Sequence, residues 1–299
     1  MWSLMTGDDR CGDTYSRRRV LRGIGTATAG LTTASVVTGP AAAGKSGDCD
    51  PDGDPPRIDT SDHFDTTWWG SVYRTDGNTE DSYDTAGGTL PEEPDELVVH
   101  VHGWRNDEEC GIAAIEATGD TYDAVDYDDP VTGLTWDSAY AWWNAKEIAD
   151  RNAPKLAAFL TEYAEQNRET TLRVQAHSLG ARVLAETLLE LDEEGTDDVL
   201  TSAVFMAGAI DNDSVAVDGE YGPAIENVVD RAENFWMPDD DVLDWAYSTF
   251  EFSQAIGNDG CDGEPPANYT DREVTKDIGH SDYYEDEDVI QQVVETYGQ

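Results

Sequence analysis

Lysine is almost missing from this chain: only four of its 299 residues are lysine. Asp and Glu number 64 against 18 Lys and Arg, which gives a formal net charge of -46 at pH 7. A surface so poor in positive charge repels the phosphates of nucleic acids and of anionic lipids. The composition therefore excludes nucleic acid as a partner and argues against binding to an acidic membrane surface.

Long hydrophobic runs are lacking as well. The apolar stretch at residues 24–37 is rich in Gly, Ala and Thr, and it is too short and too weakly apolar to span a bilayer stably. A basic segment with three consecutive arginines, at residues 16–22, precedes it, and three alanines at residues 41–43 end it in a way that suits a signal peptidase. We therefore predict a signal peptide over residues 1–43, cleavage near Gly44, and no stable membrane insertion.

This order of basic segment, mild apolar run and small residues resembles a twin-arginine signal, and every position of that pattern is filled. The resemblance implies that the protein folds before export and meets the twin-arginine translocase on its way out of the cell. The expected location is secreted and extracellular.

Cysteine is also scarce. Of the four cysteines, Cys11 leaves with the signal, and the remaining Cys49, Cys110 and Cys261 are an odd number that cannot pair completely. Their spacing fits no zinc site, so no metal is expected. Export permits a disulfide, and Cys110 with Cys261 is the candidate pair, although the sequence leaves the connectivity open.

Aromatic residues, by contrast, are plentiful, with nine Trp and thirteen Tyr in a chain that is 27% charged. Such a charge content is often typical of disorder, but the aromatic and apolar segments indicate a packed core. The composition resembles that of proteins from extreme halophiles, in particular archaea, whose acidic coats are screened by concentrated salt. We therefore expect dilution from molar salt to unfold the protein.

The predicted organisation is simple. Residues 44–57 are rich in Gly, Asp and Pro and are expected to form a flexible acidic tether. Residues 58–299 are expected to form one domain. Near its start, the aromatic and β-branched stretch Thr66–Thr75 is followed by Asp76-Gly77, which suggests a hairpin.

Apolar β runs then alternate with helical patterns, which is typical of an α/β fold with a mostly parallel central sheet and helices on both faces. Pro154 either starts a new helix or kinks one long helix, and Gly195 has the position of a helix C-cap. The predicted strands are Glu96–Val101, Val131–Trp136, Thr170–Gln175, Ser202–Ala207, Ala232–Trp236 and Tyr269–Thr275. The predicted helices are Ala141–Arg151, Pro154–Gln166, Gly180–Asp192 and Glu285–Tyr297.

The strongest chemical signal is Ala176-His177-Ser178-Leu179-Gly180, between a predicted strand and a predicted helix. A serine hydroxyl is a weak nucleophile unless it is held exposed beside a base and beside donors for an oxyanion. A tight strand-to-helix turn lifts the serine off the sheet, and the small residues Ala176 and Gly180 leave room for it. Ala176 replaces the usual glycine of a Gly-x-Ser-x-Gly pattern.

In motif and element order, residues 95–299 resemble the α/β-hydrolase family, and its lipases and esterases in particular. The turn His102-Gly103-Trp104, which follows the first of the alternating strands, is similar to the His-Gly turn that supplies half of the oxyanion hole in lipases. By that resemblance the backbone N–H groups of Trp104 and Leu179 would bind the oxyanion. Gly103 would let the backbone approach the substrate closely.

The general base is sought among five histidines. His100 and His102 belong to the early strand, and His63 precedes the core of the fold. His177 adjoins the serine and is expected to point elsewhere. His280 remains, in a loop before the last predicted helix, where the family places its base and in the family's order of serine, acid and histidine.

The acid is harder to choose because aspartate is abundant throughout the chain. The family position favours the loop after the strand that ends at Trp236, and there Asp240 is preferred because Asp-x-Val-Leu resembles the acid turn of lipase-like hydrolases. Asp239 and Asp241 are alternatives one residue away, and Asp211 is an alternative after the preceding strand. The carboxylate would hold the histidine tautomer without taking the proton.

These residues predict a secreted serine hydrolase that cleaves carboxylic esters, with a small-molecule or lipid ester as substrate and no cofactor. A peptidase or amidase using the same three residues is an alternative, because substrate choice depends on loop shape. Another alternative is a catalytically silent binding or cell-envelope protein with the same fold. The sequence assigns no oligomeric state.

Overall fold

A computed structural model describes residues 49–299 except residues 197–198, 239, 252, 277 and 299. The predicted signal peptide at residues 1–43 and the first part of the predicted tether, residues 44–48, lie outside the described residues. Asp239, one of the alternative acids, lies outside them too.

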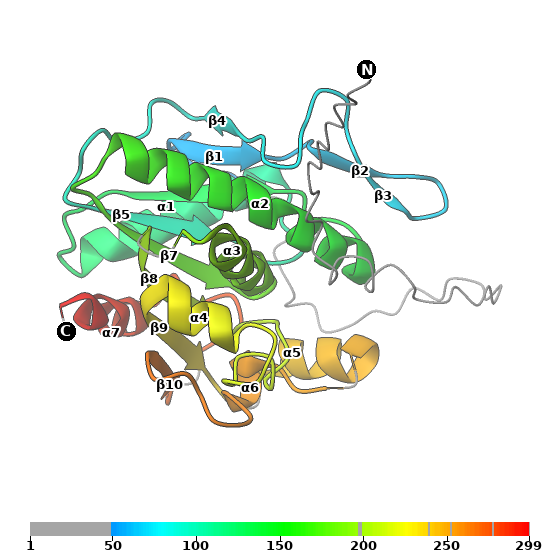
Figure 1. Cartoon of the computed structure of the whole chain (residues 1–299), viewed down its shortest axis with the longest axis vertical. Coiled ribbons are helices and arrows are strands. Elements are labelled where there is room, and N and C mark those ends of the chain that lie inside the picture. The colour runs from blue at the N-terminus through cyan, green and yellow to red at the C-terminus, as the bar shows by residue number, and fades with distance from the viewer. Residues whose placement is uncertain (1–48, 197–198, 239, 252, 277, 299) are drawn as a thin grey trace, which may run out of the picture. The chain divides into compact units, whose positions relative to one another are not determined.

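In the described part of the chain, eight strands form one sheet in the order β10-β9-β8-β7-β5-β6-β1-β4 (Figure 1). All neighbouring pairs are parallel except β1 and β4. The predicted mostly parallel sheet is therefore confirmed. Its strands are β1 (Arg57–Thr60), β4 (Asp84–Ala86), β5 (Glu96–Val101), β6 (Val131–Trp136), β7 (Thr171–His177), β8 (Leu200–Met206), β9 (Val229–Trp236) and β10 (Tyr269–Glu273).

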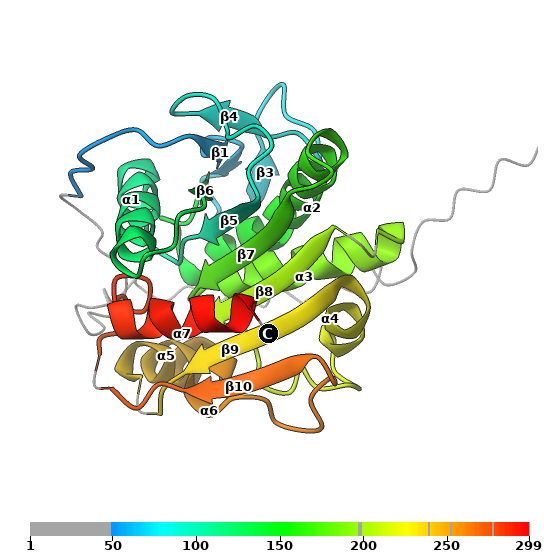
Figure 2. The same cartoon turned by 90° about the vertical axis from the view of Figure 1, so that its left-hand side faces the viewer.

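Helices cover both faces of this sheet (Figure 2). On one face α1 packs against α7, and on the other α3 packs against α2 and α4. None of the helices in the described residues has both the length and the apolar character needed to cross a membrane. The helices are α1 (Glu108–Ala124), α2 (Trp142–Gln166), α3 (Gly180–Glu194), α4 (Gly222–Val228), α5 (Asp241–Ala246), the π-helix η1 (Tyr247–Glu251), α6 (Ile256–Asp259) and α7 (Glu287–Tyr297).

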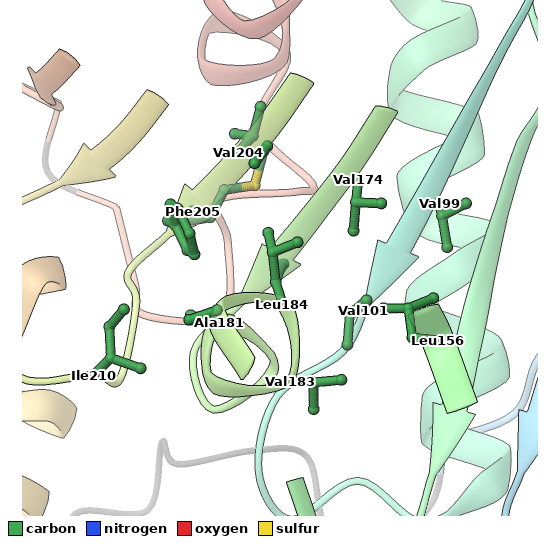
Figure 3. Close-up of a cluster of buried hydrophobic side chains, with 14 of the residues drawn as sticks. Val99, Val101, Leu156, Val174, Ala181, Val183, Leu184, Val204, Phe205 and Ile210 are labelled. Carbon is green, nitrogen blue, oxygen red and sulfur yellow. The ribbon is translucent and has the colours of Figure 1, made fainter. Parts of the chain in front are cut away.

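The core lies on the central strands β5, β7 and β8, whose side chains are buried on both faces of the sheet. Helices on both faces make such strands nearly continuous apolar runs, because neither face meets water. Figure 3 shows how side chains from these strands meet those of α2 and α3. The labelled members are Val99, Val101, Leu156, Val174, Ala181, Val183, Leu184, Val204, Phe205 and Ile210.

Several helices differ from the sequence prediction. Of the two alternatives for Pro154, the single long helix is the one observed, because α2 continues through this residue from Trp142 to Gln166. No helix was predicted at α1, whose glycines and threonines weaken its helical pattern, nor at the short helices α4, α5, η1 and α6. The predicted C-cap of α3 is confirmed: Gly195 has φ of 69°, a left-handed conformation that glycine adopts without strain.

The hairpin near the start of the domain is present, but its turn lies elsewhere than expected. It consists of β2 (Phe64–Thr66) and β3 (Val72–Arg74), which pair antiparallel. The turn therefore falls at residues 67–71, inside the stretch read as one strand, and Asp76-Gly77 follows the hairpin instead of closing it.

The cysteine pairing predicted from the sequence is wrong. Cys110 forms a disulfide with Cys49, across a sequence separation of 61 residues, and Cys261 is a free thiol. Cys261 follows α6 beside the edge strand β10, whereas Cys110 lies on α1, which packs on β6 toward the other edge. Cys49 belongs to the stretch expected to be a flexible tether, and the disulfide fastens that stretch to α1.

Candidate active site

The turn between β7 and α3 holds Ser178 in an unusual backbone conformation. β7 ends at His177, α3 begins at Gly180, and Ser178 has φ of 54°. A side chain at this φ costs conformational energy, and such strain is concentrated at functional sites. A Cβ at Gly180 would lie 2.4 Å from the carbonyl oxygen of Val101, so this position of the turn requires glycine. The buried Ala176 fits the tight approach at the other side of the serine.

Three side chains predicted from the sequence form one hydrogen-bonded chain. Ser178 Oγ lies 2.9 Å from His280 Nε2, and His280 Nδ1 lies 2.7 Å from Asp240 Oδ2. With a neutral imidazole, the serine hydroxyl donates to Nε2 and Nδ1–H donates to the carboxylate. All three residues are at most 7% exposed. The arrangement can therefore take a proton from the hydroxyl and hold the resulting charge on the ring.

Asp240 is fixed by its place at the start of α5. Its Oδ1 accepts the backbone N–H groups of Val242 and Leu243 at 3.1 Å each, as a helix N-cap does, which leaves Oδ2 for the histidine. Burial opposes ionisation, yet the His280 ring and these two N–H groups hold the pKa of Asp240 below its ordinary value. The carboxylate thus stays charged at neutral pH.

The alternative acids are placed differently. Asp211 accepts the Ser253 hydroxyl at 2.6 Å and pairs with Ala255 in an isolated bridge. Asp241 is exposed as the first residue of α5. Among the described residues, Asp240 is therefore the alternative that contacts His280.

The turn after β5 lies directly against the serine. A Cβ at Gly103 would stand 2.8 Å from the Cβ of Ser178, so only glycine allows this approach. Neither the backbone N–H of Trp104 nor that of Leu179 donates to another group of the described chain. These two N–H groups, one on each side of the serine, are thus available to an incoming oxygen. That of Leu179 lies at the start of α3, where the helix N-terminus favours negative charge.

The buried ring of His102 holds that turn in place through hydrogen bonds. Its Nδ1 donates to the carbonyl of Gly103 at 3.0 Å, and its Nε2 accepts the backbone N–H of Trp136 at 3.2 Å. Burial lowers the pKa of His102 to about 4, so the ring is neutral and can make both contacts. The Trp136 indole N–H also donates to the carbonyl of His102, at 3.0 Å.

His177 has a role that the sequence did not suggest. Its Nε2 donates to the backbone carbonyl of His280 at 2.7 Å, and its ring lies against Tyr284, with 5.2 Å between ring centroids. Burial lowers the pKa of His177 to about 3, which keeps the ring neutral. The side chain therefore holds the loop that carries His280. No signal in the sequence predicts a contact between residues 103 positions apart.

These buried histidines make stability depend on pH. Burial also lowers the pKa of His100, well below its ordinary value. In the unfolded chain all three rings take up protons below about pH 6.5, while the folded protein keeps them neutral. Each ring is therefore expected to lower the free energy of unfolding by about 1.4 kcal/mol per pH unit as the pH falls below 6.5, until its folded pKa is reached.

We expect His177→Gln to isolate one of these contributions. The Gln amide can donate to the same carbonyl but does not titrate. Denaturant unfolding in molar salt between pH 8 and pH 5 should give a stability profile less steep than that of the wild type by about 1.4 kcal/mol per pH unit below 6.5. Comparing the two proteins cancels the titration of the surface carboxylates. Parallel profiles would contradict the assignment of a neutral buried ring.

Ser178 and His280 open onto a cavity of about 400 Å³. One part of its wall is aromatic and aliphatic and comes from the turn after β5 and from α2 and α5. Another part comes from α1 and from residues 49–52, which the sequence did not connect with the site. Within the described residues, no three His, Cys, Asp or Glu side chains gather to hold a metal ion. The aromatic and aliphatic wall includes Trp104, Trp142, Val242, Leu243 and Ala246.

A family model described as "Alpha/beta hydrolase of unknown function (DUF900)" matches residues 84–253. No curated protein matches the sequence.

Several solved structures align with this chain at low identity. Trichoderma reesei cutinase is 14% identical with a TM-score of 0.31, and the alignment covers 39% of this chain and 52% of the cutinase, about half its length. The catalytic core of Trichoderma reesei acetyl xylan esterase is 12% identical with a TM-score of 0.42, covering 69% of this chain and 98% of the esterase. A Pyrobaculum calidifontis esterase is 12% identical with a TM-score of 0.40, covering 69% and 77%.

Proposed function

Because this chain belongs to the alpha/beta hydrolase family of unknown function DUF900, we propose that it is a serine hydrolase of carboxylic esters. In this proposal Ser178 is the nucleophile, His280 the general base and Asp240 the acid that orients it. The observation that carries the proposal is the unbroken hydrogen-bonded chain from hydroxyl to imidazole to carboxylate, at the wall of a cavity and on a strained turn.

The proposed reaction has two steps. The Ser178 oxygen attacks the ester carbonyl as His280 Nε2 takes its proton. The resulting oxyanion accepts hydrogen bonds from the backbone N–H groups of Leu179 and Trp104. The C–O bond to the alcohol then breaks, and His280 returns the proton to the leaving alkoxide. Water repeats the sequence on the acyl-enzyme, which releases the acid and restores the Ser178 hydroxyl. Asp240 stabilises the imidazolium in both steps without taking its proton.

The charge of the cavity favours an uncharged ester. Five carboxylates line it together with Ser178, and they come from the N-terminal segment, α1 and the loop before α7. A substrate that carries its own negative charge would be repelled by this wall. The five residues are Asp50, Asp52, Glu116, Asp120 and Glu285.

We also propose that the protein is exported through the twin-arginine route by a halophilic archaeon. The basic and apolar segments of the first 43 residues support the route, and the acidic, lysine-poor composition supports the source. The Cys49–Cys110 disulfide fits an oxidising compartment outside the cytoplasm.

The proposed activity is tested by hydrolysis in molar salt of p-nitrophenyl esters with acyl chains of increasing length. Butyryl p-nitroanilide provides the matched amide, and a fluorophosphonate probe reports an activated serine. We expect turnover of the esters, labelling by the probe and little cleavage of the anilide. Faster cleavage of the anilide than of the matched ester would favour a peptidase or amidase. Absence of both turnover and labelling in folded protein would leave the silent binding protein as the better explanation.

A further inference from the structure

The segment at residues 49–54, here called the strap, is fastened along α1. The Cys49–Cys110 disulfide joins its first residue to the first turn of the helix. Further along, the backbone N–H of Asp52 donates to Glu116 Oε2 at 3.0 Å. At the end of the strap, Arg57 pairs with Asp54, and its other terminal nitrogen contacts Glu108 at 3.2 Å. Contacts at three points along the strap thus hold it on α1.

The helix surface beneath the strap is formed by small residues. Cys110, Ala113, Ala114 and Ala117 are spaced so that they share one face of α1, and all four line the cavity that contains Ser178. Because these side chains are short, they leave space that the strap closes from the other side with Cys49, Asp50, Pro51 and Asp52. The strap and α1 therefore bound one region of the cavity together.

We propose that the strap determines substrate specificity by limiting the length of the neutral chain, on the acyl or the alcohol side of the ester, that the cavity accepts. This proposal rests on the proposed ester hydrolysis. A chain that enters between α1 and the strap contacts alanine methyl groups first. A chain long enough to pass them meets the strap backbone and the carboxylates of Asp52 and Glu116. A methylene buried there would displace water from these charged groups, which costs binding free energy. Short and medium chains are therefore the expected substrates.

Two substitutions change this region in opposite directions. Cys49→Ala/Cys110→Ala releases the strap from α1 and should raise the kcat/KM of long-chain relative to short-chain esters by about tenfold or more. Ala113→Phe keeps the disulfide and fills the space between α1 and the strap, so it should lower the same ratio by about tenfold or more. Cys261→Ala is the matched control, because it removes a thiol that lies outside the cavity and should leave the ratio unchanged.

The ratio is measured in molar salt with two substrate series. One series varies the acyl chain of p-nitrophenyl esters, and the other varies the alcohol of acetate esters, followed by proton release. Activity toward the shortest ester shows that each variant remains folded. Opposite shifts of the two variants in either series support the proposal. If both variants hydrolyse the shortest ester but keep the wild-type chain-length profile in both series, the strap has no such role, while the ester-hydrolase function stands. If the wild type hydrolyses no ester, both proposals fail.

Discussion

Ser178→Ala is expected to lower kcat/KM for p-nitrophenyl esters by about a millionfold and to abolish fluorophosphonate labelling. The hydroxyl that attacks the carbonyl would be absent, and neither His280 nor the backbone N–H groups can replace it. Its removal should leave the melting temperature in molar salt unchanged. Alanine tolerates a φ of 54° no better than serine does, and the fold does not need the hydroxyl. The measurement is steady-state hydrolysis alongside a melting curve.

Ser202→Ala is the matched control for this variant. Ser202 is also a buried serine, on the neighbouring strand β8, and its hydroxyl has no hydrogen-bond partner within the described residues. The control should retain wild-type turnover and labelling. Wild-type activity in Ser178→Ala would end the proposal that this serine is the nucleophile, and equal losses in both variants would point to a general effect of removing a buried hydroxyl.

Asp240→Asn is expected to lower kcat by about ten-thousandfold while leaving KM for short esters close to the wild-type value. The Asn amide can present an N–H to the ring where the carboxylate accepted one, which favours the imidazole tautomer whose Nε2 carries the proton. That tautomer cannot take the proton of Ser178. The loss of negative charge also removes the stabilisation of the imidazolium at 2.7 Å.

Two further aspartates serve as controls for this charge change. Asp241→Asn makes the same substitution one residue further along, at an exposed position. Asp211→Asn makes it at the alternative acid that follows β8. Both are expected to stay within a few fold of wild-type kcat. A larger loss in Asp211→Asn than in Asp240→Asn would contradict the assignment and move the role to the other carboxylate.

The central sheet and the cluster of three side chains could be anticipated because their signals are local. β5 and β6 have the bounds predicted from their apolar runs. A strand buried on both faces is a nearly continuous apolar run, so its ends are marked by the change to polar residues. Ser178 stands out because a strand, two small residues and a helix follow one another in sequence. His280 and Asp240 could be placed by their position in the order of elements, and the Asp-x-Val-Leu pattern favoured Asp240 among its neighbours. The N-cap geometry of α5 gives the physical reason, because it leaves Asp240 Oδ2 for the histidine.

The features that escaped prediction depend on contacts between distant parts of the chain. The Cys49–Cys110 bond joins residues 61 positions apart, and nothing in the sequence around Cys49 reveals that its segment lies on α1. The contact of His177 with the carbonyl of His280 exists only because the sheet and the last loop meet. The turn of the β2–β3 hairpin was misplaced because Asp-Gly is a strong local turn signal, whereas the aromatic residues at 67–71 resemble a strand.

The order of the strands has a consequence for how the protein reaches its finished state. The turn with Gly103 and the turn with Ser178 follow adjacent strands, β5 and β7, yet β6 and α2 lie between them in sequence, and Asp240 and His280 come later still. Pairings between such distant segments form slowly, because the chain loses loop-closure entropy before the new contacts contribute any stabilising free energy. No single hairpin or early fragment of a refolding chain contains a working part of this centre. Competence for chemistry is therefore expected only once the segment before α7, which carries His280, has joined the rest of the fold.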